Sequence, residues 1–165
     1  MENANHDYKY YANLGVDETN KGNFDGAIAA FDKAIELKPD WDFLYFSKAV
    51  AFHNKLELEA AFENYKKAVE LNPKMVDAYY NLAQVILARK PVGNDDLKQA
   101  LAYLENAVAL DEKFADAYYY IGVIKKNLED YEGAVEALDK VIEIQPDAVY
   151  SKALKKLILQ KYLKK

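Results

Sequence analysis

The stretch Phe31-Asp32-Lys33-Ala34-Ile35-Glu36-Leu37-Lys38-Pro39 returns three more times in this chain in closely similar form. The copies begin at Tyr65, Leu104 and Leu138, so the spacings are 34, 39 and 34 residues. A repeat of this period predicts an array of stacked supersecondary units, because a single unit cannot bury its own apolar face.

Length, composition and charge narrow the range of functions. The chain has 165 residues, the size of one domain, and no cysteine, which excludes disulfides, thiolate metal sites and cysteine nucleophiles. A formal charge of -5 argues against binding to nucleic acid, which needs a basic face. The polar start and the lack of a long apolar run predict a cytoplasmic protein with no membrane partner.

Each repeat is expected to form two amphipathic helices. In the first repeat, apolar residues recur at steps of three and four up to Gly22, and Asp7 is placed to cap this helix. The second helix is expected over 24–37, because Pro39 supplies no backbone donor and clashes with the preceding turn. Residues 1–7 are expected to form a disordered lead.

Packing residues occupy equivalent positions in all four repeats. The second helices carry a small residue at one site, a large apolar residue one turn later and a further apolar residue after that: Ala27, Ala61, Ala100 and Ala134; Phe31, Tyr65, Leu104 and Leu138; Ala34, Ala68, Ala107 and Val141. The first helices share a tyrosine and a close-contact site: Tyr11, Tyr45, Tyr79 and Tyr118; Gly15, Ala49, Ala83 and Gly122. We expect these residues to form the core, with the tyrosine hydroxyls reaching the surface.

This pattern resembles the tetratricopeptide repeat (TPR) family, whose 34-residue unit is a helix-turn-helix. The resemblance covers residues 8–146 and implies an all-α solenoid coiled as a right-handed superhelix. The predicted repeats are 8–41, 42–75, 76–114 and 115–148, followed by a C-terminal capping helix over 149–165. Glu112 replaces the proline that usually ends the unit.

The third repeat is five residues longer than the others. The excess falls between Ala83 and Ala100, and Pro91 and Gly93 place it in a loop over 89–94. Such an insertion is expected to form a surface loop, although insertions in solenoids also occur at binding faces.

The C-terminal segment is strongly basic. From Val149 onward it has six lysines and no acidic residue, whereas the preceding part has 16 basic and 27 acidic residues. If the last helix continued the spacing of the repeats, the buried packing positions would be occupied by Lys152, Lys155 and Lys156, and burying charge is costly. We therefore expect the helix to be shifted by two residues relative to that spacing, so that the buried residues are Leu154, Leu157 and Ile158. This shift turns the three lysines towards the inner side. The lysines then either complement the helix dipole and keep the end soluble, or form an anionic or self-association contact.

By resemblance to the family, the first helix of each repeat lines a concave groove that receives a segment of a partner protein. The predicted groove residues are Lys9, Ala12, Asn13, Val16 and Asn20; Phe43, Phe46, Ser47, Val50, His53 and Asn54; Asp77, Tyr80, Asn81, Gln84 and Leu87; Asp116, Tyr119, Tyr120, Val123, Lys126 and Asn127. Aromatic side chains supply contact area and amides bond a peptide backbone, so a peptide ligand is predicted, with Asn13 and Asn81 as the leading amides. Alternatively, the aromatics pack against each other between repeats.

One subtype of the family binds chaperone C-termini through a carboxylate clamp of Lys, Asn and Arg side chains. The matching positions here are Ala12, Val16, Ser47, Asp77 and Asn81, which include no cation. Binding of a chaperone tail by that clamp is therefore not expected.

Catalytic and metal-binding patterns are absent from the sequence. His6 and His53 each stand without a second ligand at a suitable spacing, and no glycine-rich phosphate loop is present. We therefore predict no enzyme activity, cofactor or metal, and a protein as the partner. The leading hypothesis is a peptide-binding adaptor, and the alternative is a scaffold that assembles with itself as a homo-oligomer through its lysine-rich end.

Overall fold

A computed structural model describes residues 7–164 of the chain, so most of the expected disordered lead lies outside the described residues. Asp7 caps the first helix as predicted. Its side chain accepts a hydrogen bond of 2.9 Å from the backbone N–H of Tyr10. This bond satisfies one of the backbone donors that the first turn leaves unpaired.

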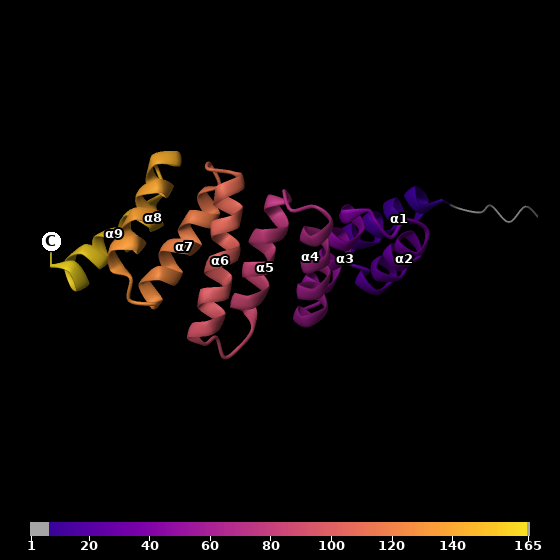
Figure 1. The fold of residues 1–165 in the computed structure, drawn as a ribbon, viewed down its shortest axis with the longest axis horizontal. Helices are drawn as coiled ribbons and strands as arrows, with labels where there is room; N and C mark the ends of the chain where they lie inside the picture. The colour runs from indigo at the N-terminus through magenta and orange to yellow at the C-terminus, as the bar shows by residue number, and fades with distance from the viewer. Residues whose placement is uncertain (1–6, 165) are drawn as a thin grey trace, which may run out of the picture. The chain divides into compact units, whose positions relative to one another are not determined.

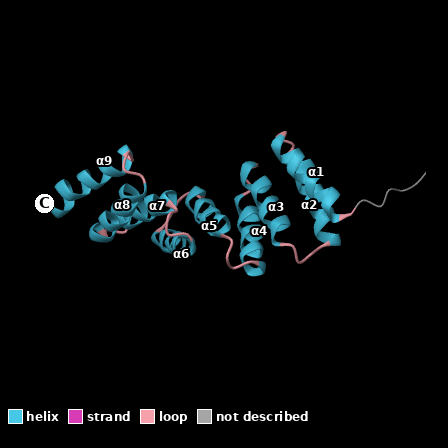
Figure 2. Cartoon of the chain, turned by 90° about the horizontal axis from the view of Figure 1, so that it is seen from above, coloured by secondary structure: helices cyan, strands magenta, loops and turns pink. Residues whose placement is uncertain are grey.

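Between residues 7 and 164 the chain is helical, with short loops and no strand (Figure 2). Figure 1 shows the order of the helices along the chain. They are α1 (Tyr8–Asn20), α2 (Phe24–Leu37), α3 (Asp42–Asn54), α4 (Leu58–Leu71), α5 (Val76–Ala88), α6 (Asn94–Leu110), α7 (Ala115–Asn127), α8 (Tyr131–Ile144) and α9 (Val149–Ile158), which continues into a π-helical turn, η1 (Leu159–Leu163). The all-α prediction is confirmed, and α2 has the predicted ends.

The chain forms two compact units that divide within α5, between Val85 and Ile86. In the first unit α1 packs on α2, α2 on α3 and α3 on α4. In the second unit α6 packs on α7, α7 on α8 and α8 on α9. Within each unit, neighbouring helices therefore pack in chain order, as a repeat array requires.

The predicted packing residues form the core. The small residues Ala27, Ala61, Ala100 and Ala134 are fully buried, and so are Phe31, Leu104 and Leu138 one turn later. A methyl group added at Gly15 would lie 2.6 Å from a ring carbon of Phe31, so the glycine allows α1 and α2 to approach.

The aligned tyrosines of the first helices lie at the boundary between core and surface. Tyr11, Tyr45, Tyr79 and Tyr118 are all half-buried. The hydroxyl of Tyr45 donates a hydrogen bond of 3.0 Å to the backbone oxygen of Pro39. This repeated position therefore packs its ring and leaves its polar end near the surface, as expected from the sequence.

The extra residues of the third repeat divide between a loop and a helix. The connection from α5 to α6 has five residues, 89–93, whereas α1 and α2 are joined by three, 21–23. The helix α6 has 17 residues, and α2, α4 and α8 have 14 each. The insertion thus extends α6 by almost one turn. The expectation that the whole excess forms a loop was wrong, because Asp96 caps the backbone N–H of Gly93 and starts the helix early.

The capping helix α9 follows the predicted shift only in part. Leu154 and Ile158 pack against α8 as expected, in a cluster with Leu138, but Leu157 is 48% exposed. Leu154 and Ile158 are four residues apart and share one face, whereas Leu157 is rotated about 100° from Ile158. The prediction that Leu157 is buried was therefore wrong.

Candidate functional site

The first helices of the first unit form a pocket of about 250 Å³. Its lining comes from α1 and α3, with Phe31 of α2 as one further residue. Its lining consists of Val16, Thr19, Asn20, Phe31, Phe43, Phe46, Ser47 and Val50. The structure thus brings together six of the predicted groove positions of repeats one and two, among them Phe43, Phe46 and Ser47.

The aromatic side chains of this pocket are partly held by packing within the chain. The ring of Phe43 lies 5.2 Å from that of Trp41, and the ring of Phe46 lies 5.6 Å from that of Tyr65. Phe43 remains 37% exposed. Aromatic packing, the alternative explanation for these residues, therefore holds both rings in part, while Phe43 keeps an exposed surface.

The polar groups of the pocket differ in what they can offer a ligand. Thr19 Oγ1 already donates a hydrogen bond of 2.8 Å to the backbone oxygen of Gly15. Within residues 7–164 the half-buried Ser47 hydroxyl makes no hydrogen bond. The pocket therefore combines an apolar interior with a hydroxyl that can bond a ligand.

The other predicted residues of the first unit lie outside this pocket. Asn13 is exposed on α1, and Ala12 beside it is buried, so Ala12 cannot line a groove. Tyr80, Asn81 and Gln84 are half-buried on α5. The Nε2 atom of Gln84 is buried without a hydrogen-bond partner among the described residues.

The second unit has a separate pocket of about 280 Å³ on its first-helix side. Of the predicted residues it contains Asp116 and Tyr119, together with Gln145 of the turn after α8 and Val149 and Tyr150 of α9. The ring of Tyr119 lies 5.7 Å from that of Tyr120 in an edge-on arrangement. Tyr120, Lys126 and Asn127 do not line this pocket, and Lys126 Nζ instead donates to Asn127 Oδ1 at 3.4 Å.

The three lysines of α9 lie beside α8, the second helix of its pair. Lys152, Lys155 and Lys156 line a pocket of about 380 Å³ with Ile142 of α8. Lys155 forms an ion pair with Asp139 of α8. The expectation that they turn to the inner, first-helix side was wrong, because the face of α9 that carries Ile158 packs on α8 and brings Lys155 to Asp139.

Sequence reasoning did not select Thr19, Val149 or Tyr150 as lining residues. Tyr150 is 83% exposed at the start of a helix that is otherwise rich in lysine. An aromatic residue at the first turn of an end cap is a signal that could have identified it, since large exposed aromatics mark contact surfaces.

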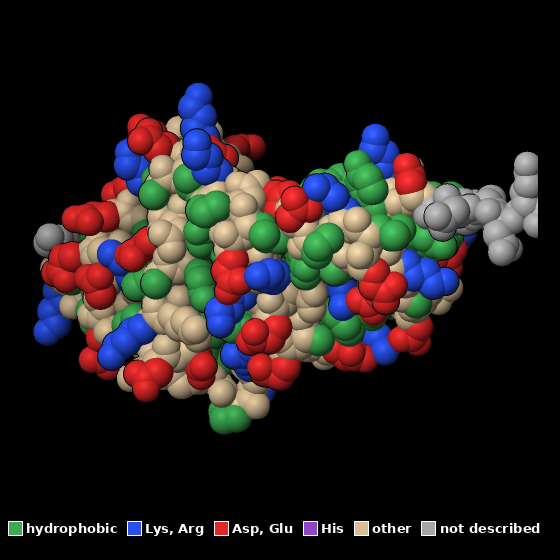
Figure 3. Space-filling model, turned by 45° about the vertical axis from the view of Figure 1, so that its right-hand side comes forward, with side chains coloured by type: hydrophobic (Ala, Val, Ile, Leu, Met, Phe, Trp, Pro, Cys, Tyr) green, Lys and Arg blue, Asp and Glu red, His purple; other side chains and the backbone are tan. Residues whose placement is uncertain are grey.

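The titratable side chains of the described residues include one perturbed histidine and no metal-binding arrangement. From residue 7 to residue 164 no cluster of three or more His, Cys, Asp or Glu side chains is arranged to bind a metal ion. His53 is half-buried with its ring 6.2 Å from that of Tyr65, and burial lowers the pKa of this histidine. Acidic and basic side chains are interspersed over the face shown in Figure 3.

None of the described helices combines the length and the apolar character that crossing a membrane requires.

Comparisons with known proteins agree with this architecture. The archaeal TPR repeat-containing protein MJ1428 of Methanocaldococcus jannaschii is 27% identical over 159 residues, which are 92% of this chain and 28% of that protein. The human Protein O-mannosyl-transferase TMTC1 is 32% identical over 79 residues, 46% of this chain and 9% of TMTC1. The chain thus spans less than a third of the length of these relatives.

Among solved structures, a crystal structure of MamA protein superposes with a TM-score of 0.83 at 27% identity, covering 93% of this chain and 81% of MamA. The family described as Tetratricopeptide repeat matches residues 8–40 and 92–157, and the one described as TPR repeat matches residues 57–88. Together these matches cover most of the chain and every α-helix except α3, and the chain belongs to the tetratricopeptide repeat family.

Proposed function

We propose that this protein is a non-enzymatic adaptor that binds a peptide segment of a partner protein on the first-helix side of its repeats. The observation that carries the proposal is the pocket between α1 and α3, where Phe43 offers an open aromatic face beside Val16 and Val50. The TPR fold is a typical protein-protein interaction module, which supports this assignment.

The size and lining of the pocket indicate what a ligand would insert. Its volume of about 250 Å³ lies just below the 300–1,000 Å³ range typical of small-molecule sites, so it suits one or two apolar side chains of a peptide. None of its lining residues is charged. A buried charge without a partner is costly, so the anchor is an apolar side chain and not a terminal carboxylate.

Polar groups around the pocket would set the position of the peptide backbone. Ser47 lies in the lining, and Asn20 and Asn13 lie on α1. An amide side chain both donates and accepts, so it can bond either the N–H or the C=O of an extended segment. Apolar contacts then supply the affinity, and hydrogen bonds supply the register.

A selection of random peptides against the full chain tests this proposal. We expect the selected peptides to share an apolar or aromatic anchor and to bind Phe43→Ala at least tenfold more weakly, measured by fluorescence anisotropy with labelled peptide. The matched control is Leu71→Ala, because Leu71 is also 37% exposed and lies outside the pocket. Unchanged binding to Phe43→Ala would refute the proposal.

A second candidate function, self-association as a scaffold, is favoured by the outer face of α9. Val149, Tyr150 and Leu157 are 71%, 83% and 48% exposed on this short helix. An apolar face of this kind on an end helix, beside several lysines, is suited to contact another copy of an acidic chain.

A further inference from the structure

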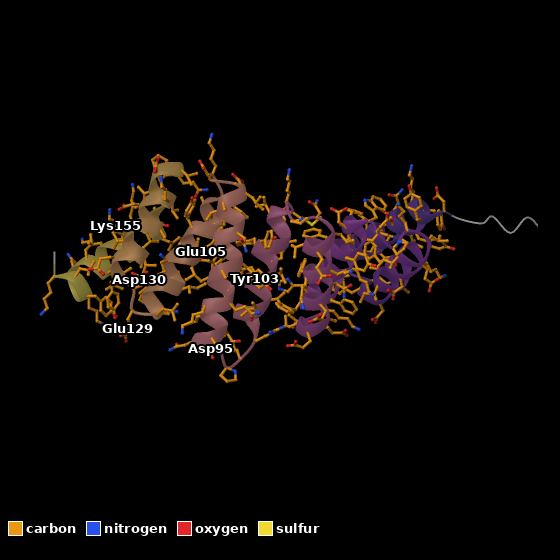
Figure 4. All side chains as sticks on the ribbon, viewed as in Figure 1. Asp95, Tyr103, Glu105, Glu129, Asp130 and Lys155 are labelled. Atoms are coloured by element: carbon orange, nitrogen blue, oxygen red, sulfur yellow. The ribbon has the colours of Figure 1, made fainter. Side chains whose placement is uncertain are left out.

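A groove runs along the second-helix side of the second unit. It consists of two adjoining pockets of about 760 Å³ and 510 Å³, which share Glu105, Val108, Tyr118 and Lys140. These residues come from α6, α7 and α8, and Figure 4 shows Glu105 on α6. Both volumes fall in the range of ligand-binding clefts.

The groove carries an excess of negative charge. Its lining contains five carboxylates and three lysines. Two of the lysines already have partners: Lys140 Nζ lies 2.9 Å from Glu143, and Lys125 Nζ lies 3.5 Å from Asp130.

Three of the lining carboxylates remain without an ion pair among residues 7–164. They are Glu105, Glu112 and Glu136. The apolar lining between them includes Val108 and Ile121. A segment that presents an apolar stripe flanked by cations would therefore match both the apolar lining and the charges of this groove.

The exposed face of α9 has this composition. Tyr150, Ala153 and Leu157 follow one another at steps of three and four, so they form one stripe along the helix. All three are exposed, and so are Lys152 and Lys156 beside them.

The same face cannot reach the groove of its own chain. Ile158 is fully buried against α8, and Lys155 is paired with Asp139. These contacts hold the Ile158 face of α9 on α8, so Ala153 and Leu157 are left exposed. Tyr150 borders the pocket beside Tyr119 and still remains 83% exposed.

We infer that the exposed face of α9 in one copy docks into the α6–α8 groove of a second copy. Tyr150 and Leu157 pack on Val108 and the neighbouring apolar lining, and Lys152 and Lys156 pair with the carboxylates that lack a partner. The contact joins two different surfaces, so it is head-to-tail and can continue from copy to copy. This inference rests on the self-association proposed above and names its acceptor surface.

Charge reversal on either surface tests the contact in the full chain. The groove variant is Glu105→Lys with Glu136→Lys, and the helix variant is Lys152→Glu with Lys156→Glu. Lys155 is left unchanged because of its pair with Asp139. Light scattering and sedimentation across a concentration series report the mass, and Glu63→Lys on α4, exposed and outside both surfaces, is the control.

We expect the unaltered chain to gain mass with concentration, and less so at about 0.5 M salt, because salt screens exposed charges. In each double variant the dissociation constant for self-association should rise at least tenfold. A mixture of the two variants should restore association, because the charge-reversed groove of one variant then meets the charge-reversed helix of the other. If the groove variant still forms the oligomer, the groove is not the acceptor surface, although the chain does associate with itself. A mass of 18.8 kDa under all conditions would overturn both.

Discussion

Replacing Gly15 by alanine tests whether close approach of α1 and α2 limits the stability of the first repeat. An added Cβ would lie 2.6 Å from Cε1 of Phe31 and 2.7 Å from two further ring carbons. Contacts this short require the ring to move. The ring is fully buried in a cluster with Ala12, Ala27 and Leu44, so it can shift only towards the pocket between α1 and α3, whose lining it joins.

Two opposing effects set the size of the change. Alanine is favoured over glycine inside a helix by about 1 kcal/mol. Overpacking of a filled core costs about 1–3 kcal/mol, and three short contacts to a fully buried ring place this site in the upper part of that range. We therefore expect a net loss of about 1–2 kcal/mol in the free energy of unfolding, which lowers the melting midpoint by about 2–8 °C for a chain of this size.

Thermal melts followed by circular dichroism measure the midpoint, and hydrogen exchange of the α1 and α2 amides localises the effect. Because repeat proteins can unfold in parts, increased exchange should be confined to the first unit. The control is Gly122→Ala at the equivalent position of repeat four. Its added Cβ would meet Leu138 Cγ at 3.0 Å and the backbone oxygen of Ala134 at 3.3 Å, so a smaller effect is expected. A Gly15→Ala chain as stable as the original would refute the reasoning, since the ring would then have room to move.

Three further predictions concern a cap, a packing site and a titrating group. Asp130→Ala removes the carboxylate that accepts from the Gly133 N–H at 3.0 Å, and should lower stability by about 1 kcal/mol in a urea melt, whereas Asp130→Asn should retain most of it. Ala61→Leu adds bulk at a fully buried site and should cost about 1–3 kcal/mol, and an unchanged melting midpoint would contradict tight packing there. Burial lowers the pKa of His53, so the unfolded chain binds a proton more readily, and stability should fall as the pH drops through about 6.5. His53→Gln should reduce this pH dependence, and equal slopes for both proteins in melts from pH 5.5 to 7.5 would exclude the effect.

Repetition made the fold predictable from the sequence. Each packing position was seen four times, so a chance match at one site could not mislead the alignment, and Ala27 and Phe31 with their equivalents are buried as predicted. Local chemistry likewise predicted the ends of individual helices. Asp7 caps α1 and Pro39 follows the end of α2, because both effects depend on neighbours in the chain.

For the candidate site, the sequence predicted which residues share one face of a helix, but not which residues of other helices lie beside them. Periodicity placed Phe43, Phe46 and Ser47 on one face of a first helix, and the structure brings them into one pocket. It did not predict that Thr19 would join them, or that Tyr150 would line the pocket of the second unit. Those neighbours come from other helices, and their distances depend on how the helices pack.

The sequence by itself determined the helix pairs, their limits and their buried positions, because these follow from local propensity and from a repeated apolar pattern. Only the tertiary structure decided the rotation of α9, which exposes Leu157 and brings Lys155 to Asp139. In α9 lysines occupy the positions at which the repeat pattern would place packing residues, so the pattern does not fix the rotation of this helix. Contact with α8 selects one rotation, and that contact joins residues that are distant in sequence.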